Sequence, residues 1–255
     1  MSIKSRNEIA IMQEGGRKHA QILSELKSLI APGVSTLILE ETAVALIKAS
    51  GGKPAFLGYK PTGARRVFPA ALCVSINNEI VHGIPNEAER ILKEGDVVSL
   101  DLGFSYKDLI TDVAVTVPCG AVDDEGRELI QATREALEAG IRAALPGNHI
   151  GDIGAAISAV VKKTKFSLAK DLAGHGVGYS VHEEPYVPNV GEKGEGVKLL
   201  PGMVIAIEPM INAGSRDIRV LRDGYTIVTK DGSRSAHFEH TVAITEDGNI
   251  VLTQD

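Results

Sequence analysis

Two segments of the sequence repeat one pattern, in which a glycine precedes an apolar strand that ends in a carboxylate. KEGDVVSLDLG covers residues 93–103 and LLPGMVIAIEPM covers residues 199–210. In the first copy Gly95 is followed six positions later by Asp101, and in the second Gly202 is followed at the same distance by Glu208. A carboxylate at the end of a buried strand is costly unless it is paired or binds a cation. Two such acids from two related half-chains predict one shared cation site.

The order of expected elements also repeats. Each half should contain two helices followed by short strands, with helices at 7–31, 35–49, 124–145 and about 152–163, and strands over 55–118 and 171–255. In each half a Pro-Gly pair ends the first helix, Pro32-Gly33 and Pro146-Gly147. Because no low-complexity linker separates the halves, we expect a single catalytic domain, residues 1–255, whose halves are about 1–118 and 119–255.

Composition restricts the class of protein. A chain of 255 residues with 44% hydrophobic and 24% charged residues is typical of a globular protein. The net charge of −6 argues against broad binding to a phosphate backbone, so we expect no DNA partner. No apolar run approaches the ~20 residues of a membrane helix, and because MSIKSRNEIAIM has no basic flank followed by a long apolar core, we expect no signal peptide. Two cysteines are too few for a disulfide framework, so we expect a cytoplasmic protein without a membrane partner.

Strand alternation brings a second acid toward Asp101. In 97–103 the side chain of Asp101 shares a strand face with Val97 and Ser99, and in 112–117 Asp112 shares a face with Ala114 and Thr116. If the two strands pair through a turn near Tyr106-Lys107, the two acids should lie directly opposite each other with Cβ atoms ~5 Å apart. Like charges there are destabilising unless a cation lies between them. The alternative is that Asp112 is a solvated acid of the turn.

The second half supplies further candidate ligands. Glu239, like Glu208, falls at one end of an apolar strand, although either glutamate alone would more often be solvated. His175 lies in AGHGVG, where flanking glycines permit close approach of the backbone. One histidine with four carboxylates suits Mn, Fe(II), Co or Zn rather than a sulfur-rich zinc site. Four negative charges balance two divalent cations, which predicts a two-metal centre with the ligands Asp101, Asp112, His175, Glu208 and Glu239.

The other histidines separate into two groups. His82 in VHGIP and His182 in SVHEEP precede the strand-acid pattern of their halves, so they are candidates for steering substrate and stabilising developing charge. A satisfied structural role is nevertheless the commoner one for a single histidine. We expect that structural role for the remaining four, His19, His149, His237 and His240. The side chain of His240 should point to the strand face opposite Glu239.

The motifs taken together resemble those of the type I methionine aminopeptidases, bacterial metallopeptidases of the pita-bread fold. They are PGVST at 32–36, CVSINNEIVHGIP at 73–85, GDVVSLDLG at 95–103, TDVAVT at 111–116, AGHGVGYSVHEEP at 173–185, AIEPM at 206–210 and SAHFEHT at 235–241. The resemblance covers essentially the whole chain and implies an α+β fold, with pseudo-twofold halves whose helices pack on a curved antiparallel sheet. Only 30 residues lie between Glu208 and Glu239, as in the short bacterial form.

The resemblance also implies an activity, removal of the N-terminal methionine when the second residue is small, by attack of a water that bridges two divalent metals (Co, Mn, Fe or Zn). Asp101 and Asp112 would hold the first metal and His175 and Glu208 the second. Asp112 and Glu239 would bridge both.

Further roles carry over from the same resemblance. Glu208 would take the proton of the attacking water, His182 would stabilise the tetrahedral intermediate, and His82 would contact substrate near the scissile amide. Phe56, Tyr59, Cys73 and Tyr225 would form the methionine pocket. The implied partners are the N-termini of nascent polypeptides, with the ribosome as a candidate place of action, and the enzyme is expected to be a monomer.

Three departures from the family pattern concern the pocket, and two other functions remain open. Tyr225 stands where such enzymes usually have Trp, and Val181, just before His182, stands where they often have Phe. The stretch 60–72, KPTGARRVFPAAL, is longer and more basic than usual. An Xaa-Pro aminopeptidase or prolidase would share the fold and ligands, but usually carries an extra N-terminal domain. A non-enzymatic pita-bread binding protein would have lost ligands, whereas all five are present here.

Overall fold

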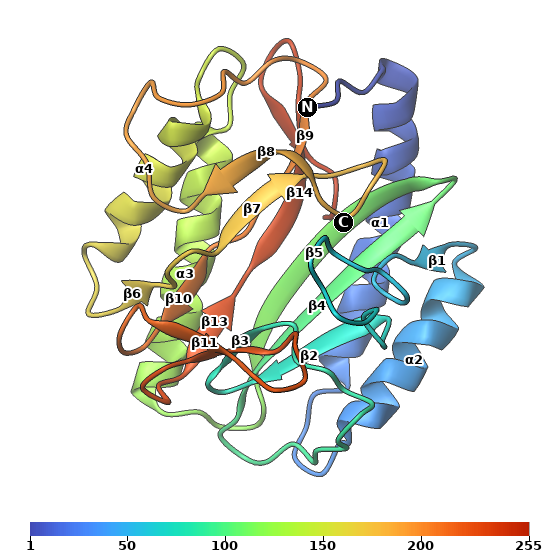
Figure 1. Cartoon of the computed structure of the whole chain (residues 1–255), viewed down its shortest axis with the longest axis vertical. Helices are drawn as coiled ribbons and strands as arrows, with labels where there is room; N and C mark the ends of the chain where they lie inside the picture. The colour runs from blue at the N-terminus through green and yellow to red at the C-terminus, as the bar shows by residue number, and fades with distance from the viewer. Residues whose placement is uncertain (255) are drawn as a thin grey trace.

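The computed structural model describes residues 1–254, and within them a large antiparallel sheet forms the centre of the molecule (Figure 1). Its strands run in the order β1-β4-β5-β14-β9-β7-β8, while β2 pairs with β4 and β15 pairs with β14. The strands are β1 (Lys53–Pro54), β2 (Leu72–Ile76), β4 (Val97–Tyr106), β5 (Leu109–Pro118), β7 (Ala173–Gly176), β8 (Glu183–Pro188), β9 (Val204–Ile207), β14 (Glu239–Ile244) and β15 (Asn249–Val251).

Two small antiparallel sheets complete the strands of the described region. One has the order β13-β10-β6 and the other β11-β12-β3. Their strands are β3 (Glu79–Val81), β6 (Ser167–Leu168), β10 (Met210–Asn212), β11 (Ile218–Val220), β12 (Ile227–Thr229) and β13 (Ser235–His237). In Figure 1 these strands gather at the lower end of the large sheet, beside β2 and the ends of β4 and β5.

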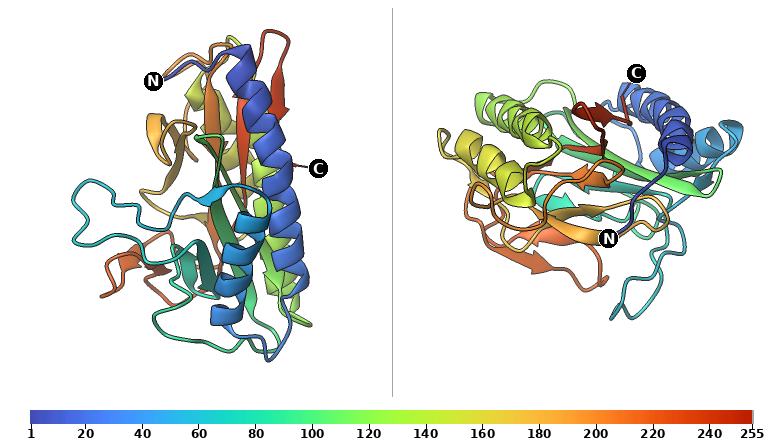
Figure 2. Two further views of the ribbon diagram at one scale, coloured as in Figure 1. Left: turned by 90° about the vertical axis from the view of Figure 1, so that its right-hand side faces the viewer. Right: turned by 90° about the horizontal axis from the view of Figure 1, so that it is seen from above.

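Four helices in residues 1–254 pack against one face of the large sheet (Figure 2). They are α1 (Arg6–Ser28), α2 (Thr36–Ala49), α3 (Asp124–Ala143) and α4 (Ile150–Val161). Each of the first three begins after a polar N-cap residue, Ser5, Ser35 or Asp123, whose side chain accepts a backbone N–H of the first turn of the helix. The α+β class and the helices covering an antiparallel sheet are therefore confirmed.

The expected helix limits need small corrections. α1 ends at Ser28 and not at Ala31, because the residue before Pro32 is disfavoured in helical conformation. α4 begins at Ile150, two residues before the expected start at Asp152. The Asp152 carboxylate instead lies in the first turn, where it accepts the backbone N–H of His149 at 2.7 Å.

The arrangement of the sheet supports our proposal that the chain is one domain with two related halves. β5 of the first half pairs with β14 of the second, and β4 and β9 flank this pair on either side. Gly95 and Gly202, which begin the repeated pattern, have φ angles of 87° and 91°. The sheet is thus continuous across the halves, and α1 and α2 cover the first half while α3 and α4 cover the second (Figure 2).

The apolar core lies between the helices and the sheet. One cluster joins α1 and α2 to β2 and β4 through fully buried residues such as Leu26, Leu39, Leu100 and Phe104. A second cluster joins α3 and α4 to β9 and β14. The opposite face of the sheet is covered by loops and short strands, so polar side chains that point there can line a pocket. Among residues 1–254 no helix has the length and apolar character needed to cross a membrane.

Candidate active site

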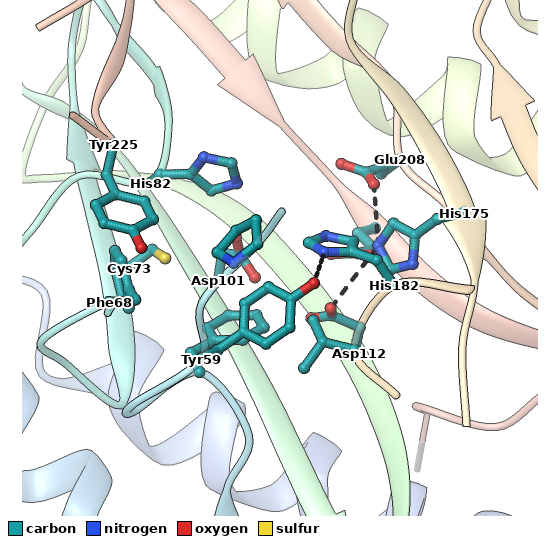
Figure 3. A pocket seen from close by; sticks show the side chains of 14 residues that line it. Tyr59, Phe68, Cys73, His82, Asp101, Asp112, His175, His182, Glu208 and Tyr225 are labelled. Carbon is teal, nitrogen blue, oxygen red and sulfur yellow. Dashed lines mark hydrogen bonds and ion pairs between the residues drawn. The ribbon is translucent and has the colours of Figure 1, made fainter. Parts of the chain in front are cut away.

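A pocket on the loop-covered face of the sheet collects every residue that the sequence singled out for chemistry or binding (Figure 3). Its lining consists of Phe56, Tyr59, Pro61, Phe68, Cys73, His82, Asp101, Asp112, His175, Val181, His182, Glu208, Tyr225 and Glu239. Pro61 and Phe68 are members that the sequence reasoning did not name. The geometry places these side chains together, and the catalytic and ligand roles assigned to them stay predictions.

Asp101 and Asp112 are diagonal neighbours and not directly opposite, so the expected register was wrong. In the β4–β5 pair, Asp101 lies opposite Ala114 and Asp112 lies opposite Gly103. The hairpin turns at Lys107-Asp108, one residue later than expected, and both turn residues have positive φ, 49° and 61°. A slip of two residues leaves each side chain on the same face. Both carboxylates therefore still enter the pocket, and as diagonal neighbours on adjacent strands they remain close to each other.

Glu239 comes beside these acids through the next strand of the sheet. In the β5–β14 pair it lies opposite Ala114, so Cys73, Asp101, Ala114 and Glu239 form one row across β2, β4, β5 and β14. The small side chain of Ala114 leaves room between the two acids. Thr241 fixes the neighbouring backbone, because its Oγ1 donates to the carbonyl of Asp112 at 2.7 Å and accepts the Asp112 N–H at 2.8 Å.

His175 and Glu208 enter from the second half of the sheet. Glu208 directly follows β9, and His175 on β7 pairs with Ala206 of β9. The glycines beside His175 are required by neighbouring strands: a Cβ on Gly174 would lie 2.2 Å from the Ala206 carbonyl oxygen, and one on Gly176 would lie 2.4 Å from that of Glu184. The glycines thus permit the backbone beside His175 to approach the backbones of the neighbouring strands closely, as expected from the sequence.

The His175 ring is oriented as in a metal-binding histidine. Its Nδ1–H donates to the Gly176 carbonyl at 2.9 Å, which leaves Nε2 without a proton and turned toward the acids. Nε2 lies 3.4 Å from Glu208 Oε1 and 4.0 Å from Asp112 Oδ2. Ligand atoms of Asp112, His175 and Glu239 all lie within 4.8 Å of one another, a spacing at which one cation can be held.

The electrostatics of the carboxylates fit a cation in this space. Asp101, Asp112 and Glu239 are at least 94% buried, and each has an oxygen without a hydrogen-bond partner among residues 1–254. Burial raises the pKa of Asp101 to about 7 and that of Glu208 to about 8. Burial, followed by repulsion from neighbouring carboxylates, raises the pKa of Asp112 and Glu239 well above the ordinary range. A divalent cation would bind the free oxygens and favour the ionised forms.

Two histidines approach the same space from the other side. His82 has a φ angle of 60°, a conformation uncommon outside glycine, and its ring lines the pocket. Burial lowers the pKa of His82 to about 4. His182 lies at the solvent-exposed rim, with its ring centroid 4.4 Å from that of His175. The Tyr59 hydroxyl lies 2.8 Å from His182 Nδ1. Both imidazoles therefore face the acids across the pocket (Figure 3).

His237 belongs to this cluster, although the sequence reasoning gave it a structural role. It is 99% buried, and its Nε2 lies 3.3 Å from Glu208 Oε2, a contact that falls short of a well-formed hydrogen bond. The available signal was its position two residues before Glu239. His240 points away, as expected, and its Nδ1 lies 2.9 Å from Thr253 Oγ1. His19 and His149 also lie outside the pocket.

The apolar end of the pocket is built from aromatic side chains. Phe68 contacts Phe56 and Tyr225 edge to face, with ring centroids 6.4 Å and 5.1 Å apart. Cys73 is buried at the base and shares its row with Asp101. Methionine, an unbranched and polarizable side chain, suits contact with such rings. The combination is a polar centre beside a narrow apolar recess.

The loop between β1 and β2 closes one wall of this recess and projects from the face opposite the helices (Figure 2). Tyr59 and Phe68 bond to each other through the Phe68 N–H and the Tyr59 carbonyl at 2.8 Å. Arg66 braces the loop: its Nε donates to the Asp223 carbonyl, its guanidinium pairs with Glu87, and its carbonyl accepts the Tyr225 hydroxyl at 2.6 Å. The unusual stretch 60–72 is therefore tied to the segment that carries Tyr225.

Comparison with known proteins gives a consistent result across the whole chain. The sequence profile of Metallopeptidase family M24 matches residues 10–246. Methionine aminopeptidase 1 of Bacillus subtilis (strain 168) is 44% identical over 251 residues, which cover 98% of each chain. The methionine aminopeptidase of Aquifex aeolicus (strain VF5) is 48% identical over 246 residues, covering 93% of this chain and 94% of that protein.

Solved structures give the same result. The crystal structure of methionine aminopeptidase from Thermotoga maritima superposes with a TM-score of 0.95 at 42% identity, and each chain is covered completely. A prolidase from Pyrococcus furiosus superposes with a TM-score of 0.76 at 23% identity, and only 65% of that longer chain is covered. At that identity the prolidase shares the fold alone.

Proposed function

The chain belongs to metallopeptidase family M24, and from that premise we propose that it removes the N-terminal methionine from nascent polypeptides whose second residue is small. The observation that carries the proposal is the full-length identity of 40–48% to proteins named methionine aminopeptidases. The function is that of a hydrolase of peptides, which excludes a non-enzymatic binding protein. The Xaa-Pro alternative has only the fold in its favour.

The enzyme uses divalent metal, as its family does, and we propose two ions per chain. Asp101 and Asp112 would hold the first ion, His175 and Glu208 the second, and Asp112 and Glu239 both. The buried, partly unbonded carboxylate oxygens support this assignment. The oxygen-rich ligand set is compatible with Co, Mn, Fe(II) or Zn. When bound, the ions supply a Lewis acid and lower the pKa of an attacking water.

The remaining residues would bind substrate and move protons. Glu208 would accept the proton of the attacking water, the role that the resemblance implies for it. Its carboxylate lies between the rings of His175 and His237. The ring of His182 would donate a hydrogen bond to the oxygen on which negative charge develops, and His82 would contact substrate beside the scissile amide.

The aromatic recess would receive the substrate's first side chain, which we propose is methionine. Phe56, Tyr59, Cys73 and Tyr225 form its walls. The polar centre lies directly beside it. The resemblance implies that the second residue of the substrate is small.

We further propose that the enzyme acts as a monomer in the cytoplasm, at or near the ribosome. All of the proposed ligands and pocket walls come from one chain, so the site needs no second copy to be complete. Both cysteines are free and buried, which is usual in a reducing compartment.

A peptide panel tests the proposed function. Met-Ser peptides should be cleaved in the presence of Mn or Co, whereas Met-Lys, Met-Leu and Xaa-Pro peptides should be cleaved far more slowly. Cleavage of Xaa-Pro peptides alone would overturn the proposal in favour of a prolidase activity. His182→Ala should lower kcat strongly while metal content stays near that of the wild type. Loss of metal in step with activity would make His182 a ligand instead.

A further inference from the structure

The contact between Tyr59 and His182 links the wall of the recess to the polar centre. The Tyr59 hydroxyl lies 2.8 Å from Nδ1 of His182, and the two rings are tilted by 58° with centroids 5.3 Å apart. Neither the Tyr59 hydroxyl nor the His182 ring has another side-chain hydrogen bond within residues 1–254. His182 lies at the exposed rim, so this bond is what selects one orientation of its ring.

The chemistry of the two groups favours one direction of the bond, with Tyr59 as the donor. A phenol O–H is a good donor, and an unprotonated imidazole nitrogen is a better acceptor than a phenol oxygen. When Tyr59 donates to Nδ1, the single proton of a neutral ring must lie on Nε2. Nε2–H is then the ring atom left to face substrate, and an oxyanion requires such a donor.

Tyr59 is itself held in place by its loop. Its carbonyl accepts the Phe68 N–H at 2.8 Å, and its own N–H donates to the Phe56 carbonyl at 2.9 Å. The same loop is braced through Arg66 to the segment that carries Tyr225. The ring of Tyr59 lines the recess while its hydroxyl reaches the polar centre.

We propose that Tyr59 is a positioning residue that holds His182 in the tautomer with its proton on Nε2, and so couples filling of the recess to stabilisation of the oxyanion. The proposal rests on the role given above to His182. It also assigns a purpose to the unusual stretch 60–72, which braces the loop that carries Tyr59.

The kinetic test compares two substitutions that each delete one hydroxyl from the same recess. Tyr59→Phe should lower kcat for Met-Ser peptides about tenfold or more, with KM within about threefold of the wild type. Tyr225→Phe, which removes the bond to the Arg66 carbonyl, should act on KM instead. Equal losses of kcat in the two variants, or a Tyr59→Phe kcat within twofold of the wild type, would overturn the proposal.

A spectroscopic readout on the wild-type protein is independent of activity. In wild-type protein labelled with ¹⁵N-histidine, and with His182→Asn used to assign the signal, His182 should show an unprotonated Nδ1 and a protonated Nε2. A wild-type ring protonated on Nδ1 would overturn the proposal even if Met-Ser peptides are cleaved. In folded Tyr59→Phe the two tautomers should mix. Failure of the wild type to cleave any Met peptide would instead refute the proposed function.

Discussion

Replacing Glu239 by glutamine should remove most of the response to metal without weakening the metal-free protein. Glu239 is 2% exposed, and its Oε1 has no hydrogen-bond partner in residues 1–254. Burial and then repulsion from Asp112 raise the pKa of Glu239 well above its ordinary range. Without a cation, burial and the neighbouring carboxylates therefore favour the protonated form of Glu239, which is uncharged, as glutamine is. The free energy of unfolding should change by less than about 1 kcal/mol.

The loss of metal-dependent stability can be calculated from the linkage between metal binding and folding. A cation that binds only the folded protein adds about 2.7 kcal/mol to the free energy of unfolding at 100 times its Kd. For a chain of this size that gain corresponds to about 5–10 °C in Tm. If loss of the Glu239 charge weakens binding about 100-fold, the same metal concentration only equals the new Kd. The gain then falls to about 0.4 kcal/mol, or about 1–2 °C.

Glu40 offers a matched control, because it is also a buried glutamate whose pKa is raised by burial. Its two oxygens accept the N–H groups of Ala71 and Leu72 at 2.7 and 2.9 Å, and its side chain does not line the pocket. Glu40→Gln turns an amide donor toward one of these N–H groups and should cost about 1–3 kcal/mol. Its metal-dependent gain in Tm should nevertheless equal that of the wild type.

Thermal unfolding followed by circular dichroism, with chelator or with a fixed Mn or Co concentration, measures both quantities. We expect the two variants to lose different quantities. Glu239→Gln should lose only the metal-dependent rise in Tm, and Glu40→Gln should lose only stability in the absence of metal. A full metal gain in Glu239→Gln would refute the placement of Glu239 at the cation site. If Glu40→Gln also lost the metal-dependent rise in Tm, the assay would be reporting a general loss of stability and not a loss of metal binding.

Two further predictions concern buried charge. Lys4→Met should lower the free energy of unfolding by about 3 kcal/mol, because the Lys4 side chain is 1% exposed and its ammonium pairs at 2.8 Å with Glu183. Arg6→Ala breaks a largely exposed pair with Glu246 and should change the stability measured in urea little. Equal losses of stability in the two variants would contradict the argument. Burial lowers the pKa of His19 to about 3, so the folded state keeps it neutral while the unfolded chain gains a proton below about pH 6.5. His19 should therefore lower the free energy of unfolding by about 2 kcal/mol between pH 7.5 and pH 5. In His19→Asn the decrease measured in urea over the same pH range should be smaller by that amount. A decrease equal to that of the wild type would argue against a buried neutral ring.

Helices were predictable from the sequence because their signals are local. Ser35 sits immediately before α2 and Asp123 immediately before α3, and in each case the side chain accepts a helix N–H as its residue type suggests. The end of α1 was placed three residues too far along the chain, since Leu29–Ala31 remain apolar although the backbone has already left the helix. Local chemistry thus fixes starts better than it fixes ends.

Strand register was not predictable in the same way. Alternation is unchanged when a hairpin slips by two residues, so the pattern around Asp101 and Asp112 fits either register. The turn at Lys107-Asp108 lacks a glycine, so the sequence does not predict the positive φ angles of its two residues. The acids of the pocket could be predicted because each is unfavourable on an apolar strand, whereas its aromatic residues and Cys73 came from the family resemblance. The contacts among the members of the pocket could not be predicted.

His237 shows where the proposed repeat could have been carried further. Thr116 Oγ1 accepts the His237 N–H at 2.8 Å and donates to its carbonyl at 2.7 Å, and Thr241 makes the same two bonds to Asp112. The two threonines are 125 positions apart, as are Asp112 and His237. The pseudo-twofold that relates β5 to β14 therefore makes His237 the counterpart of Asp112, just as the repeated strand pattern makes Glu208 the counterpart of Asp101. The chain leaves one sheet and enters another at Phe238, which hid this equivalence from strand alternation. Three of these four positions carry acids and the fourth a histidine, so the two halves contribute unequal charge to a site that the backbone builds symmetrically.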